Sequence, residues 1–370
     1  SNCNEYHRLD GDYCSICEQP TQKQNLIQPY GFVTVGEEET YEDEFERGSS
    51  SNHAAINLRN QEPTFKNTVQ EKINVELYDQ AQIIKINDNN GKRFDLTEVQ
   101  NKDLGKLVIS NDYLNHYDSF EYERKNELKN TVISSTTITD LLILDFKKLS
   151  YNKKFLDKFF YTKNNKDWNE AVVKAYYSFG SIFKQSAIDY LDVASEEIKF
   201  DIQNTETSNN KREYSRLYFY DDLPNGAGFV SYMSDPKVTN EIMKGFGILE
   251  EGTWKKNTLA YNYESDDHKC DISCQECIKN YDNRFQHKYL NWRLGIDLLE
   301  IIYSGEFNLK RWEPTKKKSS EILRSIKKTN SKVIINIDEE NIDTIIYEDK
   351  AVIIGHPLWE KNNYSNNEFQ

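Results

Sequence analysis

Residues 268–277 read His268-Lys269-Cys270-Asp271-Ile272-Ser273-Cys274-Gln275-Glu276-Cys277, and a helical pattern of apolar residues follows them directly. The pattern is H-x-C-x3-C-x2-C. Zinc prefers four thiolate or imidazole ligands in a tetrahedron, and a C-x2-C step lets one tight turn present two sulfurs to one ion. We therefore predict a closed structural zinc site with four ligands, His268, Cys270, Cys274 and Cys277. The alternative is three unrelated buried cysteines beside a surface histidine.

A second group of cysteines lies at the start of the chain. Cys3 precedes Cys14-Ser15-Ile16-Cys17, and no cysteine lies between 17 and 270. A zinc ribbon has two C-x2-C steps, of which only Cys14 and Cys17 form a complete one. His7 or a cysteine upstream of Ser1 could supply the fourth ligand, because a chain without an initiator Met reads as a fragment. A remnant without metal is the third alternative. Clustered cysteines indicate metal sites in a reducing compartment, so we expect a cytoplasmic protein.

Composition excludes several classes of protein. Of the 370 residues, 61 are acidic and 47 are basic, which gives a formal charge of −14. A protein that coats nucleic acid or an anionic membrane with its whole surface needs the opposite balance. Aromatic residues make up 13 %, too large a share for a disordered chain. The longest aliphatic run is Leu141–Leu144, far below the roughly 20 residues of a membrane span, so we expect no membrane partner.

The spacing of apolar residues predicts an α+β protein. From 65 to 147 the pattern is typical of strands, with a strand pair expected at 131–137 and 140–146. Steps of three and four residues predict a long helix over 168–191 and a second over 285–303. Further strands are expected at 216–220, 333–337, 344–347 and 351–354. The expected parts are a small zinc-ribbon remnant, a β-rich N-terminal part and a mixed α/β C-terminal domain with a structural zinc site.

These patterns divide the chain into four segments. Their limits are 1–64 for the partial zinc ribbon with an acidic loop, 65–150 for the β-rich region, 151–309 for the zinc-binding domain, and 310–370 for a basic segment with C-terminal strands.

A glycine-rich turn follows the strand at 216–220. It reads Pro224-Asn225-Gly226-Ala227-Gly228, and Phe229-Val230 replace the Lys-Ser/Thr pair that a phosphate-binding P-loop requires. Asn225, Gly226 and Gly228 therefore indicate either a tight turn or a phosphate contact at a helix N-terminus. Asp221-Asp222, just before the turn, could hold metal in a nuclease, but no third acidic motif supports that reading. No Walker or helicase motif occurs, so we expect no catalysis and name no catalytic residue.

The segment from 310 to 332 is basic. It contains nine Lys or Arg residues against two Glu, with one Trp beside the first basic pair. Basic side chains neutralise phosphates, and an aromatic ring can stack on a base. The candidate nucleic-acid contacts are Lys310, Arg311, Trp312, Lys316, Lys317, Lys318, Arg324, Lys327 and Lys328. The alternative is a solvated helix face or a linker. Near the end, His356-Pro357-Leu358-Trp359 could pack onto the core or onto a partner.

Stretches between about 130 and 300 resemble, in order, the motifs of the MrfA zinc-binding (MZB) domain family. They are Thr139–Leu142, Ala171–Gly180 with Asp189–Leu191, Tyr220–Gly228, the cysteine cluster, and Cys277–Asn283 with His287 and Leu290. Asn225 stands where the family has a glycine, and His268 where it has a cysteine. Upstream, Pro29–Phe32 resembles the start of DrmB-type proteins, but the family's further cysteines near 87–96 are missing.

The resemblance implies a function. The family's domain forms the C-terminal end of several superfamily-two DNA helicases. It also forms DrmB, the helicase-partner subunit of the DISARM anti-phage systems. The chain is thus expected to be a zinc-binding, non-catalytic accessory subunit of a DNA helicase or translocase (a DrmA-like partner), with DNA as a further partner. A metal-dependent nuclease and a purely structural subunit remain the alternatives.

Overall fold

The computed structural model describes residues 25–29, 52–58, 61–89, 92–111, 114, 121–146, 166–206, 213–306, 308–327, 332–337, 340–347, 350–353 and 355–358. The predicted N-terminal site of Cys3, Cys14 and Cys17 lies outside these residues, as does Lys328. Among the described helices, none combines the length and apolar character needed to cross a bilayer.

The chain forms two compact units, described here one at a time. Unit 1 comprises residues 1–61 and 80–139, and unit 2 comprises residues 62–79 and 140–370. Strands β4 (Ile73–Asn87) and β7 (Tyr122–Asp145) contribute residues to both. The mixed α+β class predicted from the sequence is confirmed. The four predicted segments have other limits than these units and stay a prediction.

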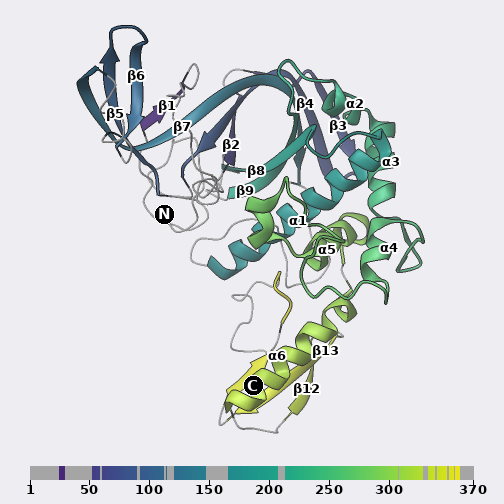
Figure 1. The fold of residues 1–370 in the computed structure, drawn as a ribbon. Coiled ribbons are helices and arrows are strands. Elements are labelled where there is room, and N and C mark those ends of the chain that lie inside the picture. The colour runs from purple at the N-terminus through teal and green to yellow at the C-terminus, as the bar shows by residue number, and fades with distance from the viewer. Residues whose placement is uncertain are drawn as a thin grey trace. The chain divides into compact units, whose positions relative to one another are not determined.

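Unit 1 is built on strands (Figure 1). Its hydrogen-bonded order is β2-β4-β7-β5-β6, with β1 pairing in parallel beside β7. The strands not yet placed are β1 (Asn25–Ile27), β2 (Asn52–Asn57), β5 (Phe94–Asn101) and β6 (Gly105–Ser110). Inward-facing apolar residues such as Ile83 and Val99 are fully buried, which gives this unit its core.

In unit 2 the end of β7 pairs with β9 (Glu213–Asp221), and β9 pairs with β8 (Ile198–Glu206), all antiparallel. Strand β3 (Phe65–Val69) forms a hairpin with the start of β4. Leu141–Leu144 at the end of β7 are consecutive and all at most 1 % exposed, so both faces of the strand are covered there. That burial explains why this stretch is a continuous aliphatic run rather than an alternating one.

Helices make up most of the rest of unit 2. They are α1 (Lys166–Leu191), α2 (Phe229–Met233), α3 (Pro236–Phe246), α4 (Leu259–Glu264), η2 (Arg284–Tyr289), α5 (Trp292–Ser304), η3 (Leu309–Trp312) and α6 (Glu313–Lys327). Short strands β10 (Leu249–Glu250) and β11 (Thr253–Trp254) form a small hairpin. Strands β12 (Lys332–Ile337), β13 (Glu340–Tyr347) and β14 (Lys350–Ile353) form a three-stranded sheet beside α6 (Figure 1).

Two sequence predictions need correction. The expected pair of strands at 131–137 and 140–146 is one continuous strand, β7, because no turn residue separates the two halves. The expected helix over 285–303 is divided into η2 and α5. The division falls at Leu290 and Asn291, because the Asn291 side chain caps α5 by accepting a hydrogen bond from the backbone of Arg293 at 3.1 Å.

Helices α1 and α5 pack closely at Gly295. A Cβ atom placed on Gly295 would lie 2.8 Å from Ile182 Cδ1 and 2.9 Å from the Ser178 carbonyl carbon. The second of these is backbone and cannot move aside as a side chain can. Glycine at this position therefore sets how closely the two helices approach.

Gly295→Ala should lower the free energy of unfolding by about 1–3 kcal/mol, because the added methyl group overpacks the α1–α5 contact. Urea unfolding followed by circular dichroism measures the change. Lys237→Ala, at an exposed position on α3, is the control and should stay within about 0.5 kcal/mol of wild type. Equal stability of Gly295→Ala and wild type would show that the helices do not pack at this distance.

Candidate metal centre

The four predicted ligands come together in the loop between α4 and η2. The ligand atoms of His268, Cys270, Cys274 and Cys277 all lie within 4.8 Å of one another. Cys274 Sγ lies 3.5 Å from Cys277 Sγ and 3.7 Å from His268 Nε2. Zinc–sulfur bonds of about 2.3 Å in a tetrahedron separate the sulfurs by roughly 3.8 Å. The cluster can therefore hold a metal ion, and its donor atoms and spacing fit zinc.

His268 is held in the orientation that a ligand needs. Its Nδ1 lies 2.8 Å from the carbonyl oxygen of Tyr263, which accepts the Nδ1 proton. The lone pair is then on Nε2, the nitrogen that faces Cys274. Outer hydrogen bonds of this kind fix the tautomer and the ring plane of metal-binding histidines. His268 therefore fits the fourth position of the site.

Residues 274–277 form a tight turn in which a backbone N–H group donates to a cysteine sulfur. The backbone N–H of Cys277 donates to the Cys274 carbonyl at 3.3 Å, and the N–H of Cys274 donates to Cys277 Sγ at 3.1 Å. Burial raises the pKa of the Cys274 thiol, but its side-chain contacts with His268 and Cys277 outweigh burial and bring the pKa to about 7. Burial raises the pKa of Cys277 to about 12. A bound cation would replace the remaining thiol protons.

The loop is fastened to the start of α5. The indole N–H of Trp292 donates to the Cys270 carbonyl at 2.9 Å, and its backbone N–H donates to the Ile272 carbonyl at 2.9 Å. The guanidinium of Arg293 donates to the Asp271 carbonyl. The apolar pattern did not indicate Trp292 and Arg293 as part of the site, although Asn291, a typical N-cap residue, marks where their helix begins.

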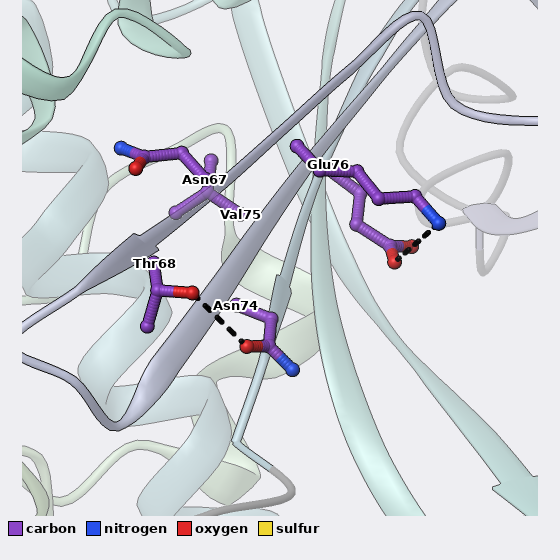
Figure 2. Close-up of a pocket in the computed structure, with 6 residues that line it drawn as sticks. Asn67, Thr68, Asn74, Val75 and Glu76 are labelled. Atoms are coloured by element: carbon purple, nitrogen blue, oxygen red, sulfur yellow. Dashed lines mark hydrogen bonds and ion pairs between the residues drawn. The ribbon is translucent and has the colours of Figure 1, made fainter.

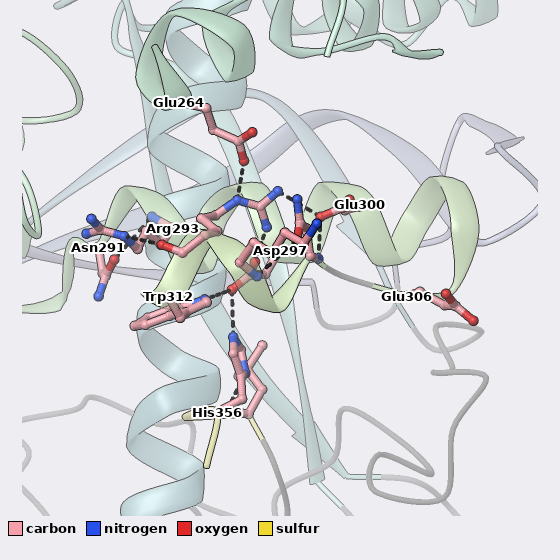
Figure 3. Close-up of polar contacts among 12 residues, drawn as sticks. Glu264, Asn291, Arg293, Asp297, Glu300, Glu306, Trp312 and His356 are labelled. Carbon is pink, nitrogen blue, oxygen red and sulfur yellow. Dashed lines mark hydrogen bonds and ion pairs between the residues drawn. The ribbon is translucent and has the colours of Figure 1, made fainter. Parts of the chain in front are cut away.

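A buried ionic cluster lies along α5 (Figure 3). Arg311, from η3, has a side chain only 2 % exposed and forms ion pairs with Glu264, Asp297 and Glu300. Its backbone carbonyl accepts a hydrogen bond from Nε of Arg293 at 3.0 Å. The predicted role of Arg311 in nucleic-acid contact therefore needs correction, because its guanidinium is enclosed by carboxylates.

Asp297 also binds Trp312 and His356. Trp312 Nε1 donates to Asp297 Oδ2 at 2.8 Å, and His356 Nε2 lies 2.9 Å from the same oxygen (Figure 3). Burial alone would raise the pKa of Asp297, but the charge of Arg311 and the hydrogen bonds from His356 and Trp312 lower it. Burial lowers the pKa of His356. Trp312 is half-buried and its ring nitrogen is used by Asp297, so the predicted stacking of Trp312 on a base stays a prediction. His356 and Leu358 pack onto the core.

The remaining basic residues lie elsewhere. Lys310, Lys317 and Lys318 are exposed and Lys316 is half-buried. Consecutive residues point about 100° apart around a helix, so the three lysines of α6, here named the basic turn (Lys316–Lys318), face different directions. Lys318 forms an ion pair with Asp271 of the metal loop. Arg324 and Lys327 lie on the same helix. Nucleic-acid binding by these residues stays a prediction.

The glycine-rich turn cradles a carboxylate of the protein itself. Asn225, Gly226 and Gly228 all have positive φ. This shape turns the chain so that the backbone N–H groups of residues 227–230 donate to Asp221, over distances of 2.7–3.2 Å. Those donors are the ones a phosphate would need. The phosphate alternative needs correction for this reason, and Asp221, which is fully buried, is poorly placed to hold a catalytic metal.

A hollow of about 520 Å³ lies on the β3–β4 hairpin (Figure 2). It is lined by Lys66, Asn67, Thr68, Asn74, Val75 and Glu76. Thr68 Oγ1 lies 3.5 Å from Asn74 Oδ1, and Lys66 Nζ lies 4.0 Å from Glu76. These pairs satisfy one another across the hairpin, and the lining offers no nucleophile with a base beside it.

The chain is similar to one of the solved protein structures. No family model and no curated protein matches the chain. It is similar to the DUF1998 helicase MrfA in a crystal structure with DNA, with a TM-score of 0.34 and 8 % identical residues. The similarity covers 68 % of this chain and 25 % of the helicase, so the chain spans about a quarter of that protein. At this level, family and activity have to be argued from the residues themselves.

Cys274→Ser should remove one zinc ion per chain and lower the free energy of unfolding by about 2–5 kcal/mol, because a closed metal site contributes directly to folding. Elemental mass spectrometry of the purified protein measures its zinc content. Chemical unfolding measures the change in the free energy of unfolding. Gln275→Ala, at the exposed neighbouring position, is the control and should keep both values. Equal zinc content in Cys274→Ser and wild type would contradict the site.

The stability of the protein should fall as pH drops from about 6.5, because the unfolded His356 then takes up a proton and the folded one, with its lowered pKa, does not. Uptake of this one proton changes the free energy of unfolding by at most about 1.4 kcal/mol per pH unit. Asp297, with a lowered pKa, contributes stability that is lost only below about pH 4. Facing His356 are Asp297 of α5 and Arg311 and Trp312 of η3.

The comparison of wild type with His356→Gln isolates this effect, since all other histidines are common to both proteins. Urea unfolding at a series of pH values between about 5 and 7.5 should show a shallower fall in the variant. Parallel curves for the two proteins would show that His356 takes up no proton on unfolding.

Proposed function

We propose that the chain is a non-catalytic accessory module, built around a structural zinc ion, that works with a DNA helicase or translocase. The observation that carries the proposal is the closed donor set of His268, Cys270, Cys274 and Cys277. Catalytic zinc sites keep one position for water or substrate, whereas four protein ligands fill a structural one. In this role the ion fixes the loop that holds Trp292 and the start of α5.

Contact with DNA is the second part of the proposal. Lys310 and Lys317 are exposed, and the basic turn lies within a chain whose formal charge is −14. A local group of lysines attracts phosphates even where the whole molecule is acidic, because screening limits each charge to roughly 8–10 Å. The acidic remainder suits a protein partner. DNA is therefore bound locally rather than over the whole surface.

The partner follows from the motifs that resemble the MZB family. Their order along the chain supports a helicase or translocase subunit of the DrmA-like kind as partner. It also supports a role in bacterial anti-phage defence of the DISARM type, in the cytoplasm. Of the alternatives, a nuclease has little support from Asp221, whose carboxylate binds backbone amides. A measurement of DNA binding distinguishes the other alternative, because a purely structural subunit would not bind DNA.

Lys317→Glu should weaken binding to duplex DNA and reduce the slope of log affinity against log salt by about 1, because one phosphate contact is lost. Fluorescence anisotropy over about 50 to 200 mM salt measures both quantities. Lys256→Glu makes the same charge change at an exposed position between β11 and α4 and is the control. Equal affinity and slope for Lys317→Glu and wild type would favour the purely structural subunit.

A further inference from the structure

Tyr281 is an aromatic residue that folding leaves on the surface. It is 78 % exposed, and it lies four residues after the last metal ligand, Cys277. A tyrosine ring in this position contributes little to the core, and its exposure to water is unfavourable by the usual measure of apolar area. Among the described large hydrophobic residues Tyr281 is the most exposed, so its ring is accessible to a ligand.

A guanidinium group lies over the ring. The Arg284 guanidinium carbon is 4.4 Å from the centre of the Tyr281 ring and 4.5 Å from that of Phe285. Arg284 thus stacks with two aromatic rings at once. Because Tyr281 is still mostly exposed, its ring keeps open surface beside a positive charge.

Several hydrogen bonds hold the backbone of the loop that carries Tyr281. The N–H of Asn280 donates to Asn283 Oδ1 and the N–H of Asn283 donates to Asn280 Oδ1, both at 2.9 Å. Asn283 Nδ2 donates to the Ile278 carbonyl at 2.7 Å, and His287 Nε2 lies 3.0 Å from the Asn280 carbonyl. The N–H of Lys279 donates to the carbonyl of the metal ligand Cys274 at 3.0 Å. The exposed ring thus stands on a rigid loop joined to the metal centre.

The surroundings of Tyr281 favour an anionic, flat ligand. Lys279, two residues before Tyr281, is half-buried, and Lys288, seven residues after it, is exposed, with its Nζ 4.7 Å from the centre of the Tyr289 ring. Asp282, the acid next to Tyr281, has its carboxylate 3.6 Å from Lys199 Nζ. Single-stranded nucleic acid combines phosphates with bases whose faces are accessible, and exposed aromatic rings beside basic residues bind it by stacking. In a duplex the base faces are covered by neighbouring bases.

We propose that Tyr281 and Arg284 form a stacking site for one base of single-stranded DNA. Lys279 and Lys288 lie beside the phosphates on either side of that base. This inference rests on the proposed function and adds to it a second contact, distinct from the basic turn, that distinguishes single strands from duplex. No bond is made or broken at the site, since binding is by stacking and charge alone.

The test uses the full chain and fluorescent oligo-dT of about 16 nucleotides. Tyr281→Ala should weaken binding at least about fivefold, because a base–aromatic stack is lost. Tyr281→Phe should bind within about twofold of wild type, since the ring remains. Tyr232→Ala, which removes a 55 % exposed tyrosine from α2, is the control and should bind as wild type. Zinc content and thermal unfolding of each variant show that it is folded.

A second readout is direct. Photocrosslinking to an oligonucleotide that carries 5-iodouracil, followed by mass spectrometry, should place the crosslink on the peptide with Tyr281.

Unchanged oligo-dT affinity in Tyr281→Ala overturns the inference, and so does a wild type that binds duplex alone. Duplex binding that still depends on Lys317 in that case leaves the proposed function standing. Absence of binding to both duplex and oligo-dT overturns the DNA contact of the proposed function as well. Loss of translocase binding with unchanged oligo-dT affinity would make the Tyr281 surface a protein contact, which also overturns the inference.

Discussion

Burial of the charged residues on α5 is the constraint on which unit 2 depends. Residues 292–302 are buried without a break, and they include Arg293, Asp297 and Glu300. A charge taken out of water has to be paired or it costs several kcal/mol. Arg311 supplies the pairing for both acids, and His356 and Trp312 complete the contacts of Asp297. The charged residues of α5 thereby bind η3 and the segment around His356, which are distant from each other in the sequence.

The metal loop contacts the start of α5, and the ionic cluster lies along the same helix. Arg293 joins them, since its guanidinium donates to the Asp271 carbonyl in the metal loop and its Nε to the carbonyl of Arg311. At the other end of α5, Lys72 Nζ donates to the Ile301 carbonyl at 3.2 Å. A change in the metal loop therefore acts on the start of α5 and, through Lys318 and Asp271, on α6. A metal ion bound there would contribute to the arrangement of the helices as well as to its own loop.

Short-range patterns in the sequence predicted much of this structure. The cysteine spacing indicated all four residues of the cluster, since a metal site in a short loop is a local property. The steps of three and four residues located α1, whose residues 171–188 are all buried except the half-buried Lys174 and Gln185. The break at Asn291 was missed, because the apolar spacing of Leu290 and Leu294 continues across it. Strand β7 was predicted as two strands, although no turn residue separates residues 131–137 from residues 140–146.

What the sequence could not provide is the partner of each polar residue. Arg311 and Lys317 look alike in a count of basic residues, yet one is enclosed by carboxylates and the other is exposed. Asp221 looks like a metal ligand until the amides of residues 227–230 are seen to surround it. Side chains that the fold already uses are poor candidates for function. Lys317 and Tyr281 are exposed instead, as a charge and an aromatic ring that the interior does not use, and the proposed DNA contacts rest on them.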